Sequence, residues 1–259
     1  MTRIYTFANQ KGGVGKTTTA INLGAYIAKF GQRVLVVDLD PQANATASLG
    51  VDKRAVQGGT YEALLNGDVP VSYILFNERL QLALLPSSPS LAGAEIELVE
   101  ESGREFRLRN ALESVDGKYD YILIDCPPSL GILTVNGLIA ARDGVLVPVQ
   151  CEYLALEGLG QLTQTIQRVQ SALFPDLHVR GVILTMFDPR TRLSSDVVRE
   201  VNNHFPGQVF KSIVPRSIRL AEAPSYGLPI SAYSPSSVGA QAYESLAKEL
   251  LNSDGVFIT

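Results

Sequence analysis

The sequence is poor in cysteine and has no long apolar run. Cys126 and Cys151 are its two cysteines, and they form no Cys-x-x-Cys pair. This usage excludes a disulfide scaffold and a zinc site and is typical of a reducing cytosol. No apolar run approaches the roughly 20 residues that a membrane-spanning helix needs, and the first residues lack the pattern of a secretory signal. We therefore expect a cytoplasmic protein.

A surplus of basic residues is also missing. Lysine and arginine number 22 against 26 acidic residues, a formal net charge of −4, so any contact with nucleic acid must come from a local basic patch. His178 and His204 have no cysteines or carboxylates around them at metal-ligand spacing, and we expect both to be structural or exposed. With 46% hydrophobic residues and no repeat or linker, the chain is expected to form one domain over residues 1–259.

A glycine-rich loop stands between a predicted strand and a predicted helix. The apolar run Ile4–Ala8 precedes it, and helical spacing begins near Thr17. In this context a glycine-rich backbone curls around phosphate groups with its N–H groups inward, and the helix start adds a positive dipole end. Lys16 is expected to reach the β- and γ-phosphates of a nucleotide, and the Thr17 hydroxyl to coordinate Mg²⁺. The loop reads Lys11-Gly12-Gly13-Val14-Gly15-Lys16-Thr17-Thr18.

Two further apolar runs end in carboxylates. Arg33–Asp38 leads on to Asp40, and Tyr121–Asp125 ends in a single aspartate. Since ligands bind beyond the carboxyl ends of the strands in a parallel sheet, these aspartates are expected beside the phosphate loop. Asp125 has the pattern of the acid that supports Mg²⁺ in phosphate-loop enzymes, and Asp38 is expected to help arrange the Mg²⁺ shell.

Predicted strands alternate with predicted helices along the chain. This order favours an α/β fold of the P-loop NTPase kind, a doubly wound and mostly parallel sheet with helices on both faces. The strands are expected near residues 4–8, 33–38, 80–85, 121–125, 144–149, 179–186 and 209–214.

The loop departs from the common phosphate-loop pattern, because Gln10 replaces a glycine and Lys11 precedes Gly12. Read as K-G-G-x-G-K-T-T, it resembles the deviant Walker A motif of the ParA/MinD ATPases. Further segments look like those of chromosomal, Soj-type ParA partition ATPases: Asp38–Gln42, Ile122–Pro128, Val147–Gly158, Leu184–Ser194 and Val214–Pro229. The resemblance implies an ATP-dependent homodimer that hydrolyses ATP with Mg²⁺, binds double-stranded DNA non-specifically and lies on the nucleoid when ATP-bound. It also implies a ParB-type partner and a role in chromosome or plasmid partitioning.

The resemblance also implies residue roles. Lys11 would reach across the dimer to the partner's nucleotide, and Asp40 would position the attacking water, so Lys11, Lys16 and Asp40 are the expected catalytic residues. Met186 and Pro215 are candidates for packing against the adenine, with plain core residues as the alternative. The other expected nucleotide contacts are Gly12, Gly13, Val14, Gly15, Thr17 and Thr18, and the expected magnesium residues are Thr17, Asp38 and Asp125.

DNA binding is expected from arginines in two loops that follow neighbouring predicted strands, namely Arg190, Arg192, Arg216 and Arg219. Scattered solubilising arginines are the alternative. Two other functions stay open, a MinD-like ATPase that cycles on membranes and a regulatory ATPase switch that acts without DNA. The tail Glu244–Thr259 lacks the basic face that anionic lipid requires, so we expect no membrane partner.

Overall fold

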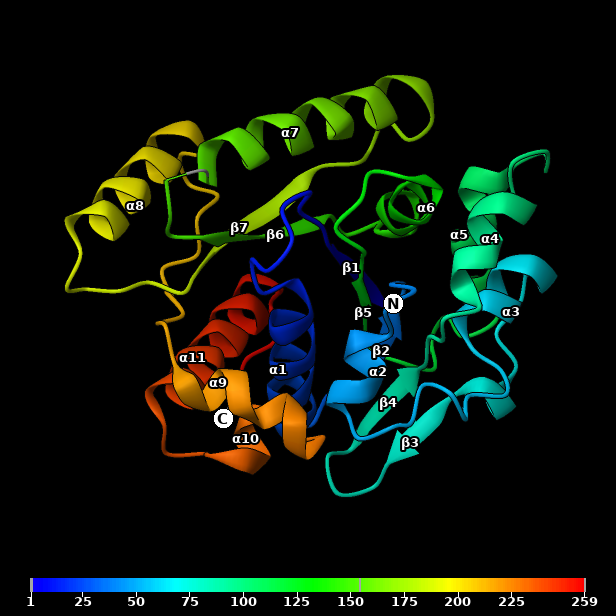
Figure 1. The fold of residues 1–259 in the computed structure, drawn as a ribbon, viewed down its shortest axis with the longest axis horizontal. Helices are drawn as coiled ribbons and strands as arrows, with labels where there is room; N and C mark the ends of the chain where they lie inside the picture. The colour runs from blue at the N-terminus through cyan, green and yellow to red at the C-terminus, as the bar shows by residue number, and fades with distance from the viewer. Residues whose placement is uncertain (1, 154, 259) are drawn as a thin grey trace.

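The computed structural model describes residues 2–153 and 155–258, and within them seven strands form one sheet (Figure 1). The strand order is β3-β4-β2-β5-β1-β6-β7. Every pairing in it is parallel except that of β3 with β4. The strands are β1 (Arg3–Phe7), β2 (Val34–Asp38), β3 (Leu75–Asn77), β4 (Leu82–Leu85), β5 (Tyr121–Asp125), β6 (Val145–Gln150) and β7 (Val179–Thr185). The predicted fold class is confirmed.

Helices cover both faces of this sheet (Figure 1). Alternate residues of β2 and β5 pack toward opposite layers: Val36 and Leu123 toward α1 and α11, Leu35 and Ile122 toward α4 and α5. No helix in the described ranges has an apolar stretch long enough to cross a bilayer. The helices are α1 (Lys16–Lys29), α2 (Asn44–Ser48), α3 (Thr60–Asn66), α4 (Leu91–Glu97), α5 (Arg107–Glu113), α6 (Ile132–Ala140), α7 (Ala155–Ala172), α8 (Arg192–His204), α9 (Ile218–Glu222), α10 (Ile230–Tyr233) and α11 (Val238–Ser253).

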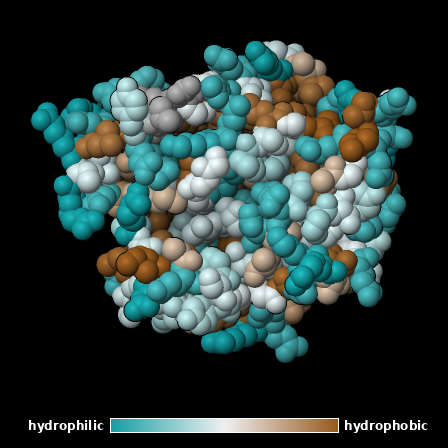
Figure 2. Space-filling model, in the orientation of Figure 1, coloured by the Kyte–Doolittle hydropathy of each residue, from teal (hydrophilic) through white to brown (hydrophobic). Residues whose placement is uncertain are grey.

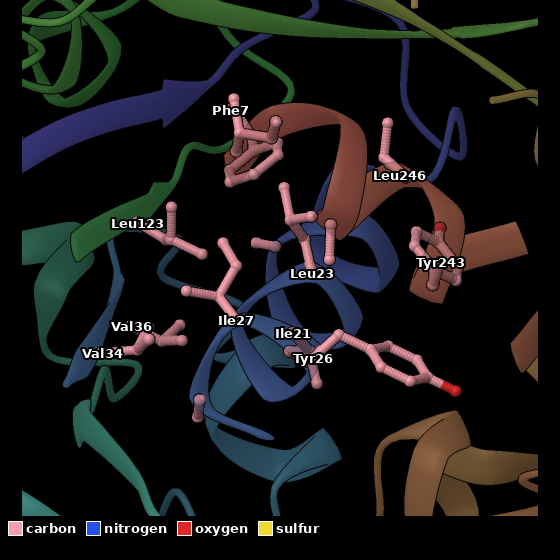
Figure 3. Packing of buried hydrophobic residues seen from close by; sticks show 14 of the residues in the cluster. Phe7, Ile21, Leu23, Tyr26, Ile27, Val34, Val36, Leu123, Tyr243 and Leu246 are labelled. Carbon is pink, nitrogen blue, oxygen red and sulfur yellow. The ribbon is translucent and has the colours of Figure 1, made fainter. Parts of the chain in front are cut away.

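Helix α1 is wedged between the sheet and α11. Figure 3 shows Leu23 and Ile27 of α1 among the side chains of Phe7 and Leu123 from the sheet, with Tyr243 and Leu246 of α11 nearby. The contact is close, because a Cβ atom added to Gly24 would come within 3.2 Å of Val36. This packing fixes the position of the loop that precedes α1.

The predicted strand at residues 209–214 was wrong. The segment runs beside β7 but joins it through isolated bridges, Val182 with Val209 and Phe187 with Pro215. The backbone N–H groups of Lys211 and Ser212 donate instead to the Glu249 carboxylate of α11, at 2.7 and 2.9 Å. The Glu249 side chain therefore accepts hydrogen bonds from backbone N–H groups that would otherwise be available for regular strand pairing. The local sequence does not reveal this contact, because Glu249 lies on a distant helix.

The C-terminal end of α11 is tied to the start of the sheet by the buried carboxylate of Asp254, whose side chain is 2% exposed. It accepts hydrogen bonds from the Tyr5 hydroxyl at 2.8 Å, the Tyr121 hydroxyl at 3.0 Å and the Arg180 guanidinium at 3.0 Å. The Arg3 guanidinium donates to the Asp254 backbone carbonyl at 2.6 Å. One acid thus satisfies polar groups on β1, β5 and β7.

Replacing this acid should destabilise the protein. Asp254→Ala leaves the Arg180 charge and two phenolic hydroxyls without their acceptor, and we expect the free energy of unfolding to fall by about 3 kcal/mol in urea denaturation. The control is Glu244→Ala, which removes an exposed ion pair with Lys248 and should cost less than about 0.5 kcal/mol. Equal losses in the two variants would contradict a structural role for Asp254.

Candidate functional site

The loop between β1 and α1 depends on glycine at two positions. Gly13 and Gly15 have φ angles of 74° and 90°, in the left-handed region that strains other residues. The Thr185 hydroxyl at the end of β7 donates to the Val14 carbonyl at 2.8 Å and holds the loop against the sheet. Since α1 begins at Lys16, the unpaired N–H groups of its first turn are available for an anion.

A cavity of about 320 Å³ lies at this helix start. The loop forms one side, and residues that follow β2, β5 and β7 form the others. Asp40 and Met186, which are predicted site residues, line it, and so do Asn44, Ser48 and Pro128, which the sequence did not indicate. The loop residues that line it are Gly12, Gly13, Gly15, Lys16, Thr17 and Thr18.

A second cavity of about 270 Å³ adjoins the first and shares Gly15, Thr18 and Met186 with it. Pro215 and Tyr243 are among its other walls. Met186 has a φ of 52°, which is rare for a residue other than glycine. The two residues predicted to pack against adenine thus line an apolar recess next to the phosphate loop.

Lys16 is buried with its ammonium group against backbone carbonyls. The Nζ atom donates to the Asn9 carbonyl at 2.9 Å and to the Lys11 carbonyl at 3.3 Å. Burial lowers the pKa of Lys16, and the nearby acids Asp125 and Asp40 oppose part of that change. Its hydrogen bonds go to carbonyl oxygens, and the nearby acids offset the cost of burial only in part, so an anionic ligand would stabilise the charge.

Asp125 is fully buried, and neither of its carboxylate oxygens has a hydrogen-bond partner among the described residues. Burial raises its pKa well above the ordinary value, and the charge of Asp38, its register partner on the neighbouring strand, raises it further. The Thr17 hydroxyl lies near and opposes the rise, although its geometry falls short of a hydrogen bond. Buried carboxylate oxygens without hydrogen-bond partners are typical of a site that binds a water molecule or a cation.

The donor set around Asp125 fits Mg²⁺. Within the described ranges no three His, Cys, Asp or Glu side chains form a metal-binding cluster. Magnesium needs no such cluster, because it is usually held by one or two protein oxygens together with phosphate oxygens and water. Thr17 and Asp125 provide such oxygens at the start of α1, where the phosphates are expected.

Asp38 holds the loop that follows β2. The backbone N–H and the hydroxyl of Thr46 both donate to its Oδ2 atom at 2.7 Å, and the Asp40 N–H donates to its Oδ1 atom at 3.2 Å. Its predicted place in the Mg²⁺ shell stays a prediction. Asp40 is 6% exposed, and within the described residues its carboxylate accepts one hydrogen bond, from the Gln42 N–H at 2.9 Å.

Three buried hydroxyl residues that the sequence pattern did not point to complete this network. The Ser87 hydroxyl donates to the Asp40 carbonyl at 2.8 Å, and its N–H donates to the Thr46 hydroxyl at 2.9 Å. The Thr60 hydroxyl donates to the Asp38 carbonyl at 2.7 Å. These residues come from separate segments, so no local signal groups them.

Lys11 is half-buried and is not among the residues that line the phosphate cavity. Its backbone N–H donates to the Asn9 Oδ1 atom at 3.0 Å. Its Cβ atom lies beside α7, 3.7 Å from the point that a Cβ atom on Gly158 would occupy. Lys11 and Lys16 therefore occupy different environments within one short loop.

Arg190 and Arg216 lie on two loops that the structure brings together, since Phe187 pairs with Pro215 and the Arg216 N–H donates to the Phe187 carbonyl. The other two predicted DNA-binding arginines were expected on these loops but lie in the helices that follow them, Arg192 at the start of α8 and Arg219 in α9. Each arginine is ion-paired with a carboxylate: Arg190 with Asp188, Arg192 with Asp196, Arg216 with Glu152 and Arg219 with Glu222. We call these four arginines the arginine patch. Because each of them is paired with a carboxylate, the net charge of the patch and its partners is close to zero. Exposed pairs of this kind contribute little free energy and are easily exchanged.

The fold and the loop together define a P-loop nucleotide-binding protein. A family model described as an AAA domain matches residues 2–179. The chromosome partitioning protein ParA of Myxococcus xanthus is 53% identical over 97% of this chain and 89% of its own. The sporulation initiation inhibitor protein Soj of Bacillus subtilis is 52% identical over 96% and 98%. This chain belongs to the ParA/Soj family of partition ATPases.

A solved structure supports the same fold. The crystal structure of cobyrinic acid a,c-diamide synthase from Mycobacterium smegmatis with bound ADP and magnesium matches with a TM-score of 0.86 and 42% identity, covering 98% of this chain and 96% of that one. Its name differs from those of the two relatives above, which are more similar in sequence.

The burial of Asp38 predicts a pH effect on stability. Its pKa rises from 3.8 to about 6 in the folded protein, so between these values the folded state binds more protons than the unfolded state. Stability must then fall as the pH rises through that window. Compared with Asp38→Asn, the wild type should lose at least about 1 kcal/mol more between pH 4.5 and pH 7. Urea titrations without nucleotide and magnesium measure both proteins, and parallel pH profiles would contradict the shift.

Proposed function

We propose that this protein is a Mg²⁺-dependent ATPase whose ATP-bound dimer holds double-stranded DNA without sequence preference and, with a ParB-type partner, drives chromosome or plasmid partitioning. The observation that carries the ATPase proposal is the buried carboxylate of Asp125, which has no hydrogen-bond partner among residues 2–153 and 155–258 and lies near Lys16 and Thr17 at the phosphate loop. The family, and a structural neighbour crystallised with ADP and magnesium, support it.

The residues divide the work of phosphoryl transfer. Lys16 and the loop N–H groups hold the β- and γ-phosphate oxygens and offset their charge. Magnesium, when bound, supplies further neutralisation of the phosphate oxygens; the Thr17 hydroxyl would coordinate it, and Asp125 would support it through a water. Asp40 lines the cavity with one carboxylate oxygen that accepts no hydrogen bond within the described chain, and it would orient the attacking water.

Lys11 is proposed to complete the site of a second subunit. Within its own subunit it does not line the phosphate cavity. ATP carries about four negative charges, of which Mg²⁺ and Lys16 offset about three, so the site retains roughly one buried negative charge. Lys11 of the other subunit would bring it near neutrality. Without ATP the lysines of two facing loops would repel each other, which makes dimerisation depend on ATP.

Dimerisation also explains how a nearly charge-balanced patch holds DNA. In a dimer the two arginine patches are linked, so once one patch has bound DNA the second binds the same molecule at a high effective concentration. The dimer therefore binds DNA more tightly than a single patch does. Nucleotide binding would then control DNA attachment. The membrane alternative finds little support on α11, where Lys248 pairs with Glu244 and Glu249 accepts from backbone N–H groups of the segment beside β7.

The two loop lysines should fail in different ways. Lys16→Ala removes the buried counter-charge of the phosphates and should weaken binding of a fluorescent ATP analogue by on the order of 100-fold. Lys11→Ala should bind the analogue within about threefold of wild type yet stay monomeric in sedimentation at saturating ATP. Normal ATP affinity of Lys16→Ala would remove the phosphate-loop assignment, and a stable Lys11→Ala dimer would remove the cross-subunit role.

The arginine patch is tested by the salt dependence of DNA binding. The double variant Arg190→Ala/Arg219→Ala loses two phosphate contacts per subunit and therefore four per dimer, which should make the slope of log affinity against log salt shallower by about four units. Arg54→Ala is the matched control, because Arg54 forms the same kind of exposed pair, with Asp52, two residues earlier. Random duplex DNA with ATP serves as the ligand, and an unchanged slope in the double variant would exclude this patch.

A further inference from the structure

A recess of about 530 Å³ lies at the opposite end of α1 from the phosphate cavity, and we call it the far recess. It is lined by Val34, the first residue of β2, by Gln81, which precedes β4, and by Lys118 and Tyr119, which precede β5. The far recess therefore lies where these parallel strands begin, whereas the phosphate cavity lies beyond their carboxyl ends. Helix α1 reaches from one to the other, and its 14 residues span about 20 Å.

The walls of the far recess are mainly apolar and partly open to solvent. Val71 and Phe76 line it together with Ile74, and they are 68% and 57% exposed. Phe76 belongs to β3, the outermost strand of the sheet in Figure 1. On the face that Figure 2 presents, apolar side chains likewise gather in patches between hydrophilic ones. Several exposed apolar residues beside one recess are typical of an interaction site.

The polar side chains that line the far recess are basic or neutral. They are those of Arg33, Lys118, Tyr119, Gln32 and Gln81, and among the residues that the structure describes no carboxylate lines the recess. An apolar wall with cations beside it and no acid favours a ligand that combines apolar groups with negative charge.

Lys118 supplies the positive charge that is not balanced by a neighbour. The two acids nearest to it in sequence each pair with an arginine, Asp116 with Arg142 and Asp120 with Arg33, both at 2.7 Å. Lys118 itself forms no ion pair within residues 2–153 and 155–258. Its ammonium group is therefore available to a carboxylate from outside the chain.

The backbone at the end of α1 does not compete for such a ligand. The Gly31 N–H donates to the Ala28 carbonyl at 2.9 Å, and the Gln32 N–H donates to the Ile27 carbonyl at 3.3 Å. Since these carbonyls already have donors, recognition in the far recess depends on the side chains.

We propose that the far recess binds an acidic segment of a partner protein, with bulky apolar side chains against Val71 and Phe76 and carboxylates facing Lys118. A small molecule fits less well, because small-molecule sites bury most of their ligand and these walls are largely exposed. The inference goes beyond the proposed ATPase. Because α1 separates the two sites, the partner binds in any nucleotide state, and the contact serves to recruit the protein rather than to control hydrolysis.

The probe is a short fluorescein-labelled peptide in which leucines and phenylalanines are interspersed with glutamates, and a second peptide carries lysine in place of each glutamate. Anisotropy measures their binding to the full chain. The acidic peptide should bind, and Val71→Glu should weaken it by about tenfold or more. The matched control is Val238→Glu on α11, outside the recess, which should leave the affinity within about twofold. Val71 is 68% exposed and Val238 62%, so neither change disturbs the core.

A charge reversal tests the role of Lys118. Lys118→Glu should weaken the acidic peptide by about tenfold or more and bind the lysine peptide better than the acidic one. Equal binding of the two peptides by the wild type, an unchanged preference in Lys118→Glu, or equal losses in Val71→Glu and Val238→Glu would overturn the proposal. If Val71→Glu abolishes self-association of the wild-type chain in sedimentation while the acidic peptide still binds normally, the occupant is a second copy and the proposal fails.

The same titration with a saturating ATP analogue and magnesium separates this inference from the proposed function. The affinity for the acidic peptide should agree within about twofold with and without the analogue, and a larger difference would contradict the independence of the two sites. A chain that binds the analogue but not the acidic peptide refutes the recess assignment and leaves the ATPase function standing. A chain that binds the peptide but not the analogue refutes the ATPase function alone.

Discussion

The interaction on which the site depends is that between Lys16, at the start of α1, and Asp125, at the end of β5. Both side chains are buried, and the fold offsets the cost of burying them only in part. The Lys16 ammonium contacts backbone carbonyls, and the Asp125 carboxylate has no hydrogen-bond partner within the described chain. Burying charge in this way costs free energy unless a ligand restores what water provided. The protein therefore contains a polar centre with incomplete hydrogen bonding, which ATP and magnesium would complete.

The surrounding packing holds this centre in place. Helix α1 is fixed between the sheet and α11, the Thr185 hydroxyl holds the loop, and Asp38 organises the segment that carries Asp40. The segments expected to respond to nucleotide are different in kind. They are the short connections that follow β2 and β5, which begin in the core at Leu39 and Cys126 and are then held by hydroxyl groups such as those of Ser87 and Thr134. Hydrogen bonds of this type exchange at a lower cost than a core rearranges.

Much of this architecture was predictable from local sequence. Continuous apolar runs ending in aspartate predicted buried parallel strands, and the glycine-lysine-threonine loop predicted the strand-to-helix turn between β1 and α1. The misses have two physical origins. Glu249 takes backbone donors from a predicted strand, Thr46 and Ser87 complete a network from distant segments, and carboxylates pair with the predicted DNA-binding arginines. The contacts of Glu249, Thr46 and Ser87, and the pair of Arg216 with Glu152, join segments that only folding brings together. The pairs of Arg190, Arg192 and Arg219 are local, so the sequence did contain their signal.

Asp254, which follows α11, affects the order in which the chain can fold. β1 lies in the interior of the sheet and is made first, yet its Tyr5 hydroxyl bonds to Asp254, 249 residues later. A nascent chain on the ribosome therefore contains a central strand whose Tyr5 hydroxyl lacks its acceptor until Asp254 has been synthesised. This layer cannot be completed before α11 and Asp254 are available, and contacts of such long sequence separation slow folding. Chaperones that shield apolar strands would have their longest period of action on this half of the sheet.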